Sequence, residues 1–245
     1  MTVEDRLSAH SPDGWVGQRF ELPGGGNALF TGRADGNMSS VCDDGSGPHA
    51  VDARERLREL VRAATLARGY QVHGSTVRRV TSAALGEEPP AGAVRSAHEA
   101  DGQATALRGV ATMVLSADCL PVAIGCAGAV AMIHAGWRGL AAGVLEEGVR
   151  AVLELGDGGE LVAVVGPGAG ACCYEVGPEV HHAFGGAHRD GRRIDLRAIA
   201  RERLLAAGVA RVQDARVCTI CDERFFSHRR EGARAGRQAG VAWLS

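Results

Sequence analysis

The chain has 245 residues and a formal net charge of −2, and 45% of its residues are hydrophobic. This length is enough to bury a substantial core without disulfide staples, and the near-neutral charge argues against a nucleic-acid partner held by bulk electrostatic attraction. All 27 basic residues are arginine, which excludes chemistry through a Schiff-base lysine.

The N-terminal segment 1–14 (MTVEDRLSAHSPDG) contains acidic residues and no apolar stretch, so we expect it to be flexible and not a secretory signal. No run approaches the roughly 18 apolar residues of a membrane span. Seven cysteines without an export signal favour reduced thiols, and hence metal-binding or catalytic roles over disulfides. We therefore expect a cytoplasmic protein that makes no membrane contact.

The first half of the chain gives weak structural signals. Residues 31–49 are rich in Gly, Ser, Asn and Asp, which indicates a long surface loop. A helix is expected next, because apolar residues recur at helical spacing at Leu57, Leu60, Val61 and Ala64. Weak alternation predicts a strand within 70–80, and a second loop, rich in Gly and Pro, is expected at 86–102.

The second half gives clearer signals. Apolar runs predict strands at 109–117, 128–134 and 160–166. A helix between the last two of these would have one apolar stripe, formed by Leu145, Val149, Val152 and Leu153.

The C-terminal region is expected to contain one more helix and two more strands. Asp195 is the predicted N-cap of a helix over 195–207, and strands are expected near 211–218 and 238–244. Helices and strands are mixed along the chain, which indicates an α/β or α+β fold.

Three potential metal ligands lie at or near predicted strand ends: His73 in QVHG, Cys119 in ADCLP and His134 in HAGWRG. Two imidazoles and one thiolate suit zinc, and three protein ligands leave a fourth position open, as in catalytic zinc sites. Their separations form no recognised metal motif, and by spacing alone packed core side chains are the more usual explanation.

The segments QVHG, SADCLPV, IHAGWRGL, GPGAGACCYEVG and CT…FFSHRR…AGRQ resemble, in order and spacing, the YfiH-type laccase-domain family. The resemblance extends from about Phe30 to Leu244. It implies a single α+β domain, 1–245, in which mixed β-sheets are flanked by helices. It also implies that His73, Cys119 and His134 bind a metal, usually zinc.

The resemblance further implies action on purine nucleosides. The implied reactions are phosphorolysis of the N-glycosidic bond of adenosine, inosine or methylthioadenosine, with phosphate as the second substrate, and deamination of adenosine. The family also carries a polyphenol-oxidase label, and some members are linked to the editing of peptidoglycan precursors.

The predicted catalytic residues are Cys119, Asp118 and Arg138. Arg138 and Arg33 are candidates for binding phosphate, because guanidinium groups hold phosphate through paired hydrogen bonds. Asp118 is a general base, a partner of the metal site or a turn residue at a strand end. Trp137 either walls a base-binding pocket or packs in the core.

The sequence departs from the usual family pattern in the region expected to cover the substrate. The usual loop TTR-x-GG-x-S is replaced by TGRADGNMS at 31–39, and the usual Asn-Arg pair by Ala53 and Arg54. Substrate preference is therefore the least constrained part of the prediction.

Four further cysteines and a glycine-rich turn carry weaker signals. The turn at 166–170 lacks the Lys-Ser/Thr of a phosphate-binding loop, so a plain tight turn is expected. Cys172 and Cys173 are expected to be small buried thiols. Cys218 and Cys221 form a single CxxC, which is weak evidence for zinc or redox chemistry.

Three alternatives to a zinc nucleoside enzyme remain open. A multicopper laccase is disfavoured by nine histidines with no His-x-His pair, although copper could enter the site in vitro. A metal-free hydrolase would use Cys119 as a nucleophile activated by His134 or His73. A zinc-stabilised binding protein would have no turnover.

Overall fold

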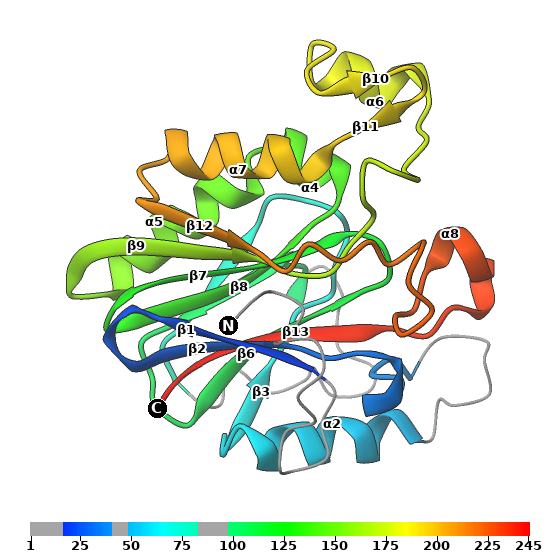
Figure 1. Cartoon of the computed structure of the whole chain (residues 1–245). Helices are drawn as coiled ribbons and strands as arrows, with labels where there is room; N and C mark the ends of the chain where they lie inside the picture. The colour runs from blue at the N-terminus through cyan, green and yellow to red at the C-terminus, as the bar shows by residue number, and fades with distance from the viewer. Residues whose placement is uncertain (1–16, 41–48, 83–97) are drawn as a thin grey trace, which may run out of the picture.

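The computed structural model describes residues 17–40, 49–82 and 98–245. The segment expected to be flexible (1–14) lies outside these residues, as do parts of the two predicted loops (41–48 and 83–97). Two large β-sheets stack on each other, and helices cover both outer faces of the stack (Figure 1).

The first sheet has five strands in the order β1-β2-β13-β6-β3. Neighbouring strands are antiparallel except for the parallel pair β3 and β6. The strands are β1 (Gln18–Leu22), β2 (Gly26–Phe30), β3 (Thr65–Ala67), β6 (Val110–Ser116) and β13 (Gln238–Leu244). The C-terminal strand β13 therefore lies in the middle of the sheet, where it pairs on both edges.

The second sheet has six strands in the order β12-β9-β7-β8-β5-β4. Its strands are β4 (Val77–Val80), β5 (Gly102–Thr105), β7 (Leu120–Ala127), β8 (Ala129–Ala135), β9 (Gly158–Val165) and β12 (Arg211–Asp214). The outer pairs β12–β9 and β4–β5 are parallel and the inner pairs are antiparallel. Gly128, whose φ of 81° suits glycine, closes the tight hairpin between β7 and β8.

Helices of the described residues lie on both sides of the stack. Helices α4, α5 and α7 cover the six-stranded sheet, and α2 lies below the five-stranded sheet (Figure 1). The α-helices are α2 (His49–Leu60), α4 (Trp137–Ala141), α5 (Val144–Leu155), α6 (Pro178–Ala183), α7 (Leu196–Ala206) and α8 (His228–Glu231). The small elements are η1 (Pro23–Gly25), η2 (Arg33–Asp35), η4 (Gly232–Arg234), β10 (Arg189–Asp190) and β11 (Arg193–Ile194). Among the described helices, none combines the length and apolarity needed to cross a membrane.

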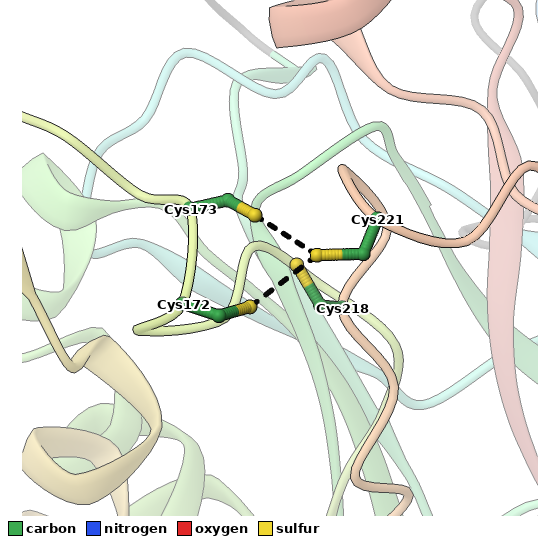
Figure 2. A group of neighbouring side chains, drawn as sticks. All are labelled: Cys172, Cys173, Cys218 and Cys221. Atoms are coloured by element: carbon green, nitrogen blue, oxygen red, sulfur yellow. Dashed lines mark hydrogen bonds between the residues drawn. The ribbon is translucent and has the colours of Figure 1, made fainter.

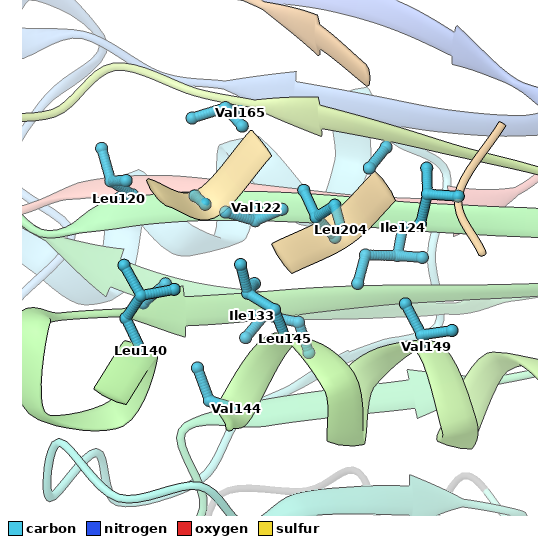
Figure 3. Close-up of a cluster of buried hydrophobic side chains, with 14 of the residues drawn as sticks. Leu120, Val122, Ile124, Ile133, Leu140, Val144, Leu145, Val149, Val165 and Leu204 are labelled. Carbon is cyan, nitrogen blue, oxygen red and sulfur yellow. The ribbon is translucent and has the colours of Figure 1, made fainter. Parts of the chain in front are cut away.

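Side chains of α5 and the six-stranded sheet form one apolar core (Figure 3). Leu145, Val149 and Val152 of α5 are buried in it. Leu153, which we expected in the same stripe, is 48% exposed. It follows Val152 by about 100° around the helix and therefore points away from the sheet.

A second apolar layer fills the space between the two sheets and includes Phe30, Val114 and Met132. Every residue of β8 and nearly every residue of β7 is buried, because both faces of this hairpin are covered. Strands covered on both faces have continuous apolar sequences rather than alternating ones. This explains the long apolar run between 120 and 135.

The predicted fold class is confirmed: the chain has mixed β-sheets flanked by helices. The expected helix at 195–207 is α7, and Asp195 is its N-cap, accepting hydrogen bonds from the backbone N–H groups of Arg197 and Ala198. The helix expected through Ala64 ends at Leu60. The sequence patterns predict no strand at β1, β2, β3, β5 or β7, all of which form, and the strand expected over 211–218 ends at 214.

Candidate metal centre

The three predicted metal ligands come from loops or strand ends that meet at one end of the inner strands of the second sheet. His73 lies between β3 and β4, and Cys119 lies in the short turn between β6 and β7. His134 lies near the end of β8, where it pairs with Pro121 of β7. The β7–β8 register therefore brings the Cys119 turn beside His134.

The potential ligand atoms of His73, Cys119 and His134 all lie within 4.8 Å of one another. The Cys119 Sγ atom is 3.8 Å from Nε2 of His73. The two imidazole rings stand edge to face, with centroids 4.9 Å apart. His134 is buried but His73 is exposed, so the centre can be reached from solvent.

Gly136 makes room for this cluster. A Cβ at this position would lie 2.7 Å from Cδ2 of His73 and 3.1 Å from Sγ of Cys119. The sequence His134-Ala135-Gly136 thus supplies one ligand and the space for the other two.

Asp101, which no motif in the sequence marks, holds both histidines. Its buried carboxylate accepts a hydrogen bond of 2.8 Å from Nδ1 of His134, which leaves Nε2 of His134 free to bind a metal. It also accepts three backbone N–H groups, from Val72, His73 and Gly74, at 2.7–3.0 Å. These bonds fix the left-handed backbone of His73, whose φ is 59°.

The electrostatics of the centre suit metal binding. Burial alone would raise the pKa of the Cys119 thiol, but the nearby His134 and His73 lower it to about 6. Burial would likewise lower the pKa of His134, but Cys119 and Asp101 raise it to about 9. The donor set of one thiolate and two imidazoles, with a hydrogen-bonded carboxylate behind it, fits zinc.

Asp118 lies next to Cys119 with a φ of 88°, so its backbone is in the left-handed region. Its carboxylate is buried and accepts hydrogen bonds from Thr219 Oγ1 (2.6 Å), Ser227 Oγ (3.1 Å) and the backbone N–H of Arg229 (2.7 Å). These contacts tie the Cys119 turn to the segment that follows β12.

The two arginines predicted to bind phosphate differ in their surroundings. Arg138 is exposed on α4 and stacks over the ring of Trp137, 4.4 Å from its centroid. No hydrogen bond or ion pair joins its guanidinium to another described residue. Arg33 instead forms a 2.5 Å ion pair with Glu231 and donates to the backbone carbonyl of Phe225. Trp137 is partly buried and packs against the core beneath α4.

A second group of potential metal ligands lies outside this centre. The sulfur atoms of four cysteines from two loops point toward one another (Figure 2): Cys172, Cys173, Cys218 and Cys221. Our expectation of buried thiols at Cys172 and Cys173 is wrong, because Cys172 is exposed and Cys173 only partly buried.

An open cavity of about 930 Å³ lies against α6, and its described lining includes none of the three metal-ligand candidates. Glu175, His181 and Arg229 are among the residues that line it. Arg229 lies between this cavity and the Asp118 region, since its backbone binds Asp118 and its guanidinium stacks over Tyr174.

Comparison with known proteins agrees with the fold and shows the family. Residues 30–245 match the family model described as "Multi-copper polyphenol oxidoreductase laccase". The chain belongs to this family. Within it, the chain is similar to proteins named purine nucleoside phosphorylase. One is PA4543 of Pseudomonas aeruginosa, with 37% identity over 94% of this chain and 98% of that protein. Another is SCO2081 of Streptomyces coelicolor, with 33% identity over 94% of this chain and 99% of that protein.

Solved structures of similar proteins have the same fold. Protein NMB0706 of Neisseria meningitidis has a TM-score of 0.76 at 31% identity and covers 94% of this chain and 99% of its own. YlmD of Geobacillus stearothermophilus has a TM-score of 0.76 at 27% identity, with 93% and 96% covered. Proteins named YfiH are also among the similar proteins, so the predicted resemblance to the YfiH-type laccase-domain family is confirmed.

Proposed function

We propose that the chain is a zinc-dependent purine nucleoside phosphorylase that also deaminates adenosine. The proposal is carried by one observation, the convergence of His73, Cys119 and His134 in a centre that solvent can reach. The names of the relatives supply the substrate class. Inosine, adenosine and methylthioadenosine are the proposed nucleosides, and phosphate is the second substrate.

The number of ligands supports a catalytic role over a purely structural one. Structural zinc is usually closed by four protein ligands, whereas catalytic zinc has three and an open position. A zinc ion held here would supply Lewis acidity, which polarises substrate atoms and acidifies water. Asp101 keeps His134 in the tautomer that presents Nε2, and its bonds to the backbone hold His73 in place.

Phosphorolysis needs a site for the phosphate anion. In the reaction, the bond between the purine nitrogen and C1′ of the sugar breaks, a phosphate oxygen bonds to C1′, and the purine nitrogen takes up a proton. Arg138 lies shortly after His134 in the chain, and its guanidinium has no anionic partner among the described residues. We assign phosphate binding to Arg138 and a supporting role to Arg33, which would first have to leave Glu231.

Asp118 is assigned a positioning role. Three hydrogen-bond donors hold its two carboxylate oxygens and direct the side chain toward Thr219, Ser227 and the backbone of Arg229. Trp137 presents one face to Arg138, and we assign it to the border of the same side of the site.

A metal-free Cys–His hydrolase is the second candidate. It is favoured by the low pKa of Cys119 beside His134, which would give a thiolate next to an imidazolium. A laccase-like oxidase has the family description in its favour, but each of the two metal-ligand groups of the described residues would hold a single ion.

The test combines metal analysis with turnover of inosine and adenosine, each with and without phosphate. We expect release of hypoxanthine from inosine only with phosphate, and conversion of adenosine to inosine without it. Both activities should be lost in Cys119→Ala and retained in Cys126→Ala, which removes a buried thiol away from both metal-ligand groups. Full turnover by metal-free protein would refute the zinc mechanism and support the Cys–His hydrolase.

A further inference from the structure

Two loops run side by side where the neighbouring parallel strands β9 and β12 end. One follows β9 and contains Cys172 and Cys173; the other follows β12 and contains Cys218 and Cys221. Backbone hydrogen bonds join them, from the N–H of Gly168 to the carbonyl of Val217 and from the N–H of Thr219 to the carbonyl of Gly168. The backbone thus brings together two cysteine pairs that lie far apart in the sequence.

The four thiols converge on one point between the loops (Figure 2). All four Sγ atoms lie within 4.8 Å of one another. Cys221 Sγ is 2.9 Å from that of Cys173 and 3.4 Å from that of Cys172. Zinc–sulfur bonds of about 2.3 Å at tetrahedral angles would set the sulfur atoms about 3.8 Å apart. The observed cluster needs only small side-chain adjustments to reach that geometry.

Among the four sulfur atoms, the surroundings favour the thiolate form of Cys218. The backbone N–H of Gly170 donates to Cys218 Sγ at 3.2 Å, which stabilises the charged form of the sulfur. A Cβ on Gly170 would lie 3.3 Å from the sulfur atoms of both Cys172 and Cys218, so glycine gives these thiols room. Arg230 holds the Cys218–Cys221 turn by donating to the carbonyls of Thr219 and Ile220.

Two other uses of four cysteines fit the geometry less well. A disulfide has a sulfur–sulfur bond of about 2.05 Å and joins only two thiols, whereas Cys221 here is near two partners and the remaining thiols converge on the same point. An iron–sulfur cluster places several atoms between its cysteines, which would spread the sulfur atoms farther apart. A single tetrahedral ion with four sulfur ligands is typical of zinc.

We propose that the chain binds a second zinc ion in a closed, structural site formed by four thiolates, those of Cys172, Cys173, Cys218 and Cys221. Cys172 and Cys221 are exposed, so the ion has a path of entry. The site is separate from the His73–Cys119–His134 centre and does not depend on the function proposed for that centre.

The second site stabilises the loops that hold Asp118, the residue next to Cys119 in the first site. Thr219, between the two cysteines of the CxxC, donates to the carboxylate of Asp118 at 2.6 Å. The N–H of Ala169, in the other loop, donates to the carbonyl of Asp118 at 2.7 Å. Zinc held by the four cysteines therefore fixes both loops that contact Asp118, the residue next to Cys119.

The test is the zinc content of protein purified with a reducing agent and without chelators. Wild-type protein should contain about two zinc ions per chain, Cys221→Ser and Cys119→Ala about one each, and the double variant almost none. Cys126→Ala is the matched control and should keep both. A wild-type content of one zinc ion that Cys221→Ser retains would overturn the proposal.

X-ray absorption of the wild-type protein gives a second readout that does not require a folded variant. With both sites filled, the number of sulfur ligands at about 2.3 Å, averaged over the two zinc ions, should be about 2.5. If only the His73–Cys119–His134 site is filled, it should be about one. Mass spectrometry of the intact protein provides a further check. A mass two hydrogens below that of the reduced chain, with a disulfide mapped to these cysteines, would overturn the zinc assignment in favour of a redox pair. Bound iron in place of the second zinc would overturn it as well.

Discussion

The Asp101 Oδ1 atom lies 2.8 Å from Nδ1 of His134, and both side chains are buried. The same carboxylate accepts the backbone N–H of His73. One side chain thus sets the tautomer of one imidazole ligand and the backbone of the other. The His134 hydrogen bond and the backbone N–H groups outweigh burial and lower the pKa of Asp101, so the carboxylate stays ionised.

Asp101→Asn should weaken zinc binding at the triad about 10- to 100-fold, as is typical when the partner of a metal-binding histidine is changed. Asparagine keeps the size of the side chain but loses the charge that orients the N–H of His134. The measurement is a competition titration with a zinc chelator. Asp190→Asn, at a side chain that is 79% exposed, is the matched control and should bind zinc as the wild type does. Equal affinities in both variants would show that Asp101 does not support the centre.

Gly136→Ala should also reduce zinc affinity, by about tenfold or more, because overpacking costs about 1–3 kcal/mol. The added methyl group would lie 2.7 Å from His73 and 3.1 Å from Cys119, and so would push two ligands apart. Gly74→Ala is the control: it also adjoins His73, but its Cβ would meet nothing closer than 3.5 Å. Circular dichroism should show both variants folded. If Gly136→Ala binds zinc normally, the close packing of the ligands is not required.

The convergence of His73, Cys119 and His134 could be predicted from the sequence, but the residues that support them could not. His73, Cys119 and His134 lie in distinctive local segments that resemble a known family. Asp101 lies in an ordinary-looking loop sequence, and its hydrogen-bond partners are 27 to 33 residues away. Only the pairing of β5 with β8 brings it beside His134.

The sequence patterns predict neither the strand β7 nor the cluster of four cysteines. Pro121 and the Asp118–Cys119 turn interrupt the apolar run, and β7 is buried on both faces, so it lacks the alternation that marks a half-buried strand. The CxxC at Cys218 looks incomplete in sequence because its other two thiols are 48 and 49 residues away from Cys221. The four cysteines come together only through tertiary contacts between two loops.

Asp118→Ala should lower the free energy of unfolding by about 3 kcal/mol or more, since three buried donors left without an acceptor cost about 1–3 kcal/mol each. The donors are Thr219, Ser227 and the backbone of Arg229. Asp118→Asn should lose less stability, because asparagine tolerates the φ of 88° better than alanine does. Urea denaturation measures both effects. A stable Asp118→Asn protein with zinc bound but no turnover would identify Asp118 as a proton carrier instead of a positioning residue.

Arg138→Met should raise the KM for phosphate about tenfold or more and leave zinc content unchanged, because a charge-assisted hydrogen bond contributes about 1.5–3 kcal/mol. Methionine retains an apolar contact with Trp137, so the change mainly removes the charge. Arg33→Met is the comparison variant. It should lose about 0.5–1 kcal/mol of stability with its partly exposed ion pair to Glu231 and change the phosphate KM less. The reverse order of the two KM effects would move the phosphate site to Arg33.

Zinc binding should release about one proton from the Cys119–His134 pair near pH 7.5 and about two from this pair below pH 6, since zinc binds thiolate and neutral imidazole. In the metal-free protein the pKa of Cys119 is lowered to about 6 and that of His134 is raised to about 9. Between these values the pair holds one proton, on His134, and below pH 6 the thiol is protonated as well. The affinity for zinc should therefore fall about tenfold for each pH unit between pH 9 and pH 6, and more steeply below pH 6.

Calorimetric titration with zinc in buffers of different ionisation enthalpy measures the protons released. Titration of Cys119→Ala provides the reference, because that variant retains the four-cysteine site, and the difference between the two proteins belongs to the triad. If the difference is near two protons at pH 7.5, Cys119 is a neutral thiol in the metal-free protein. A metal-free hydrolase based on its thiolate would then lose its physical basis, while zinc binding would remain possible.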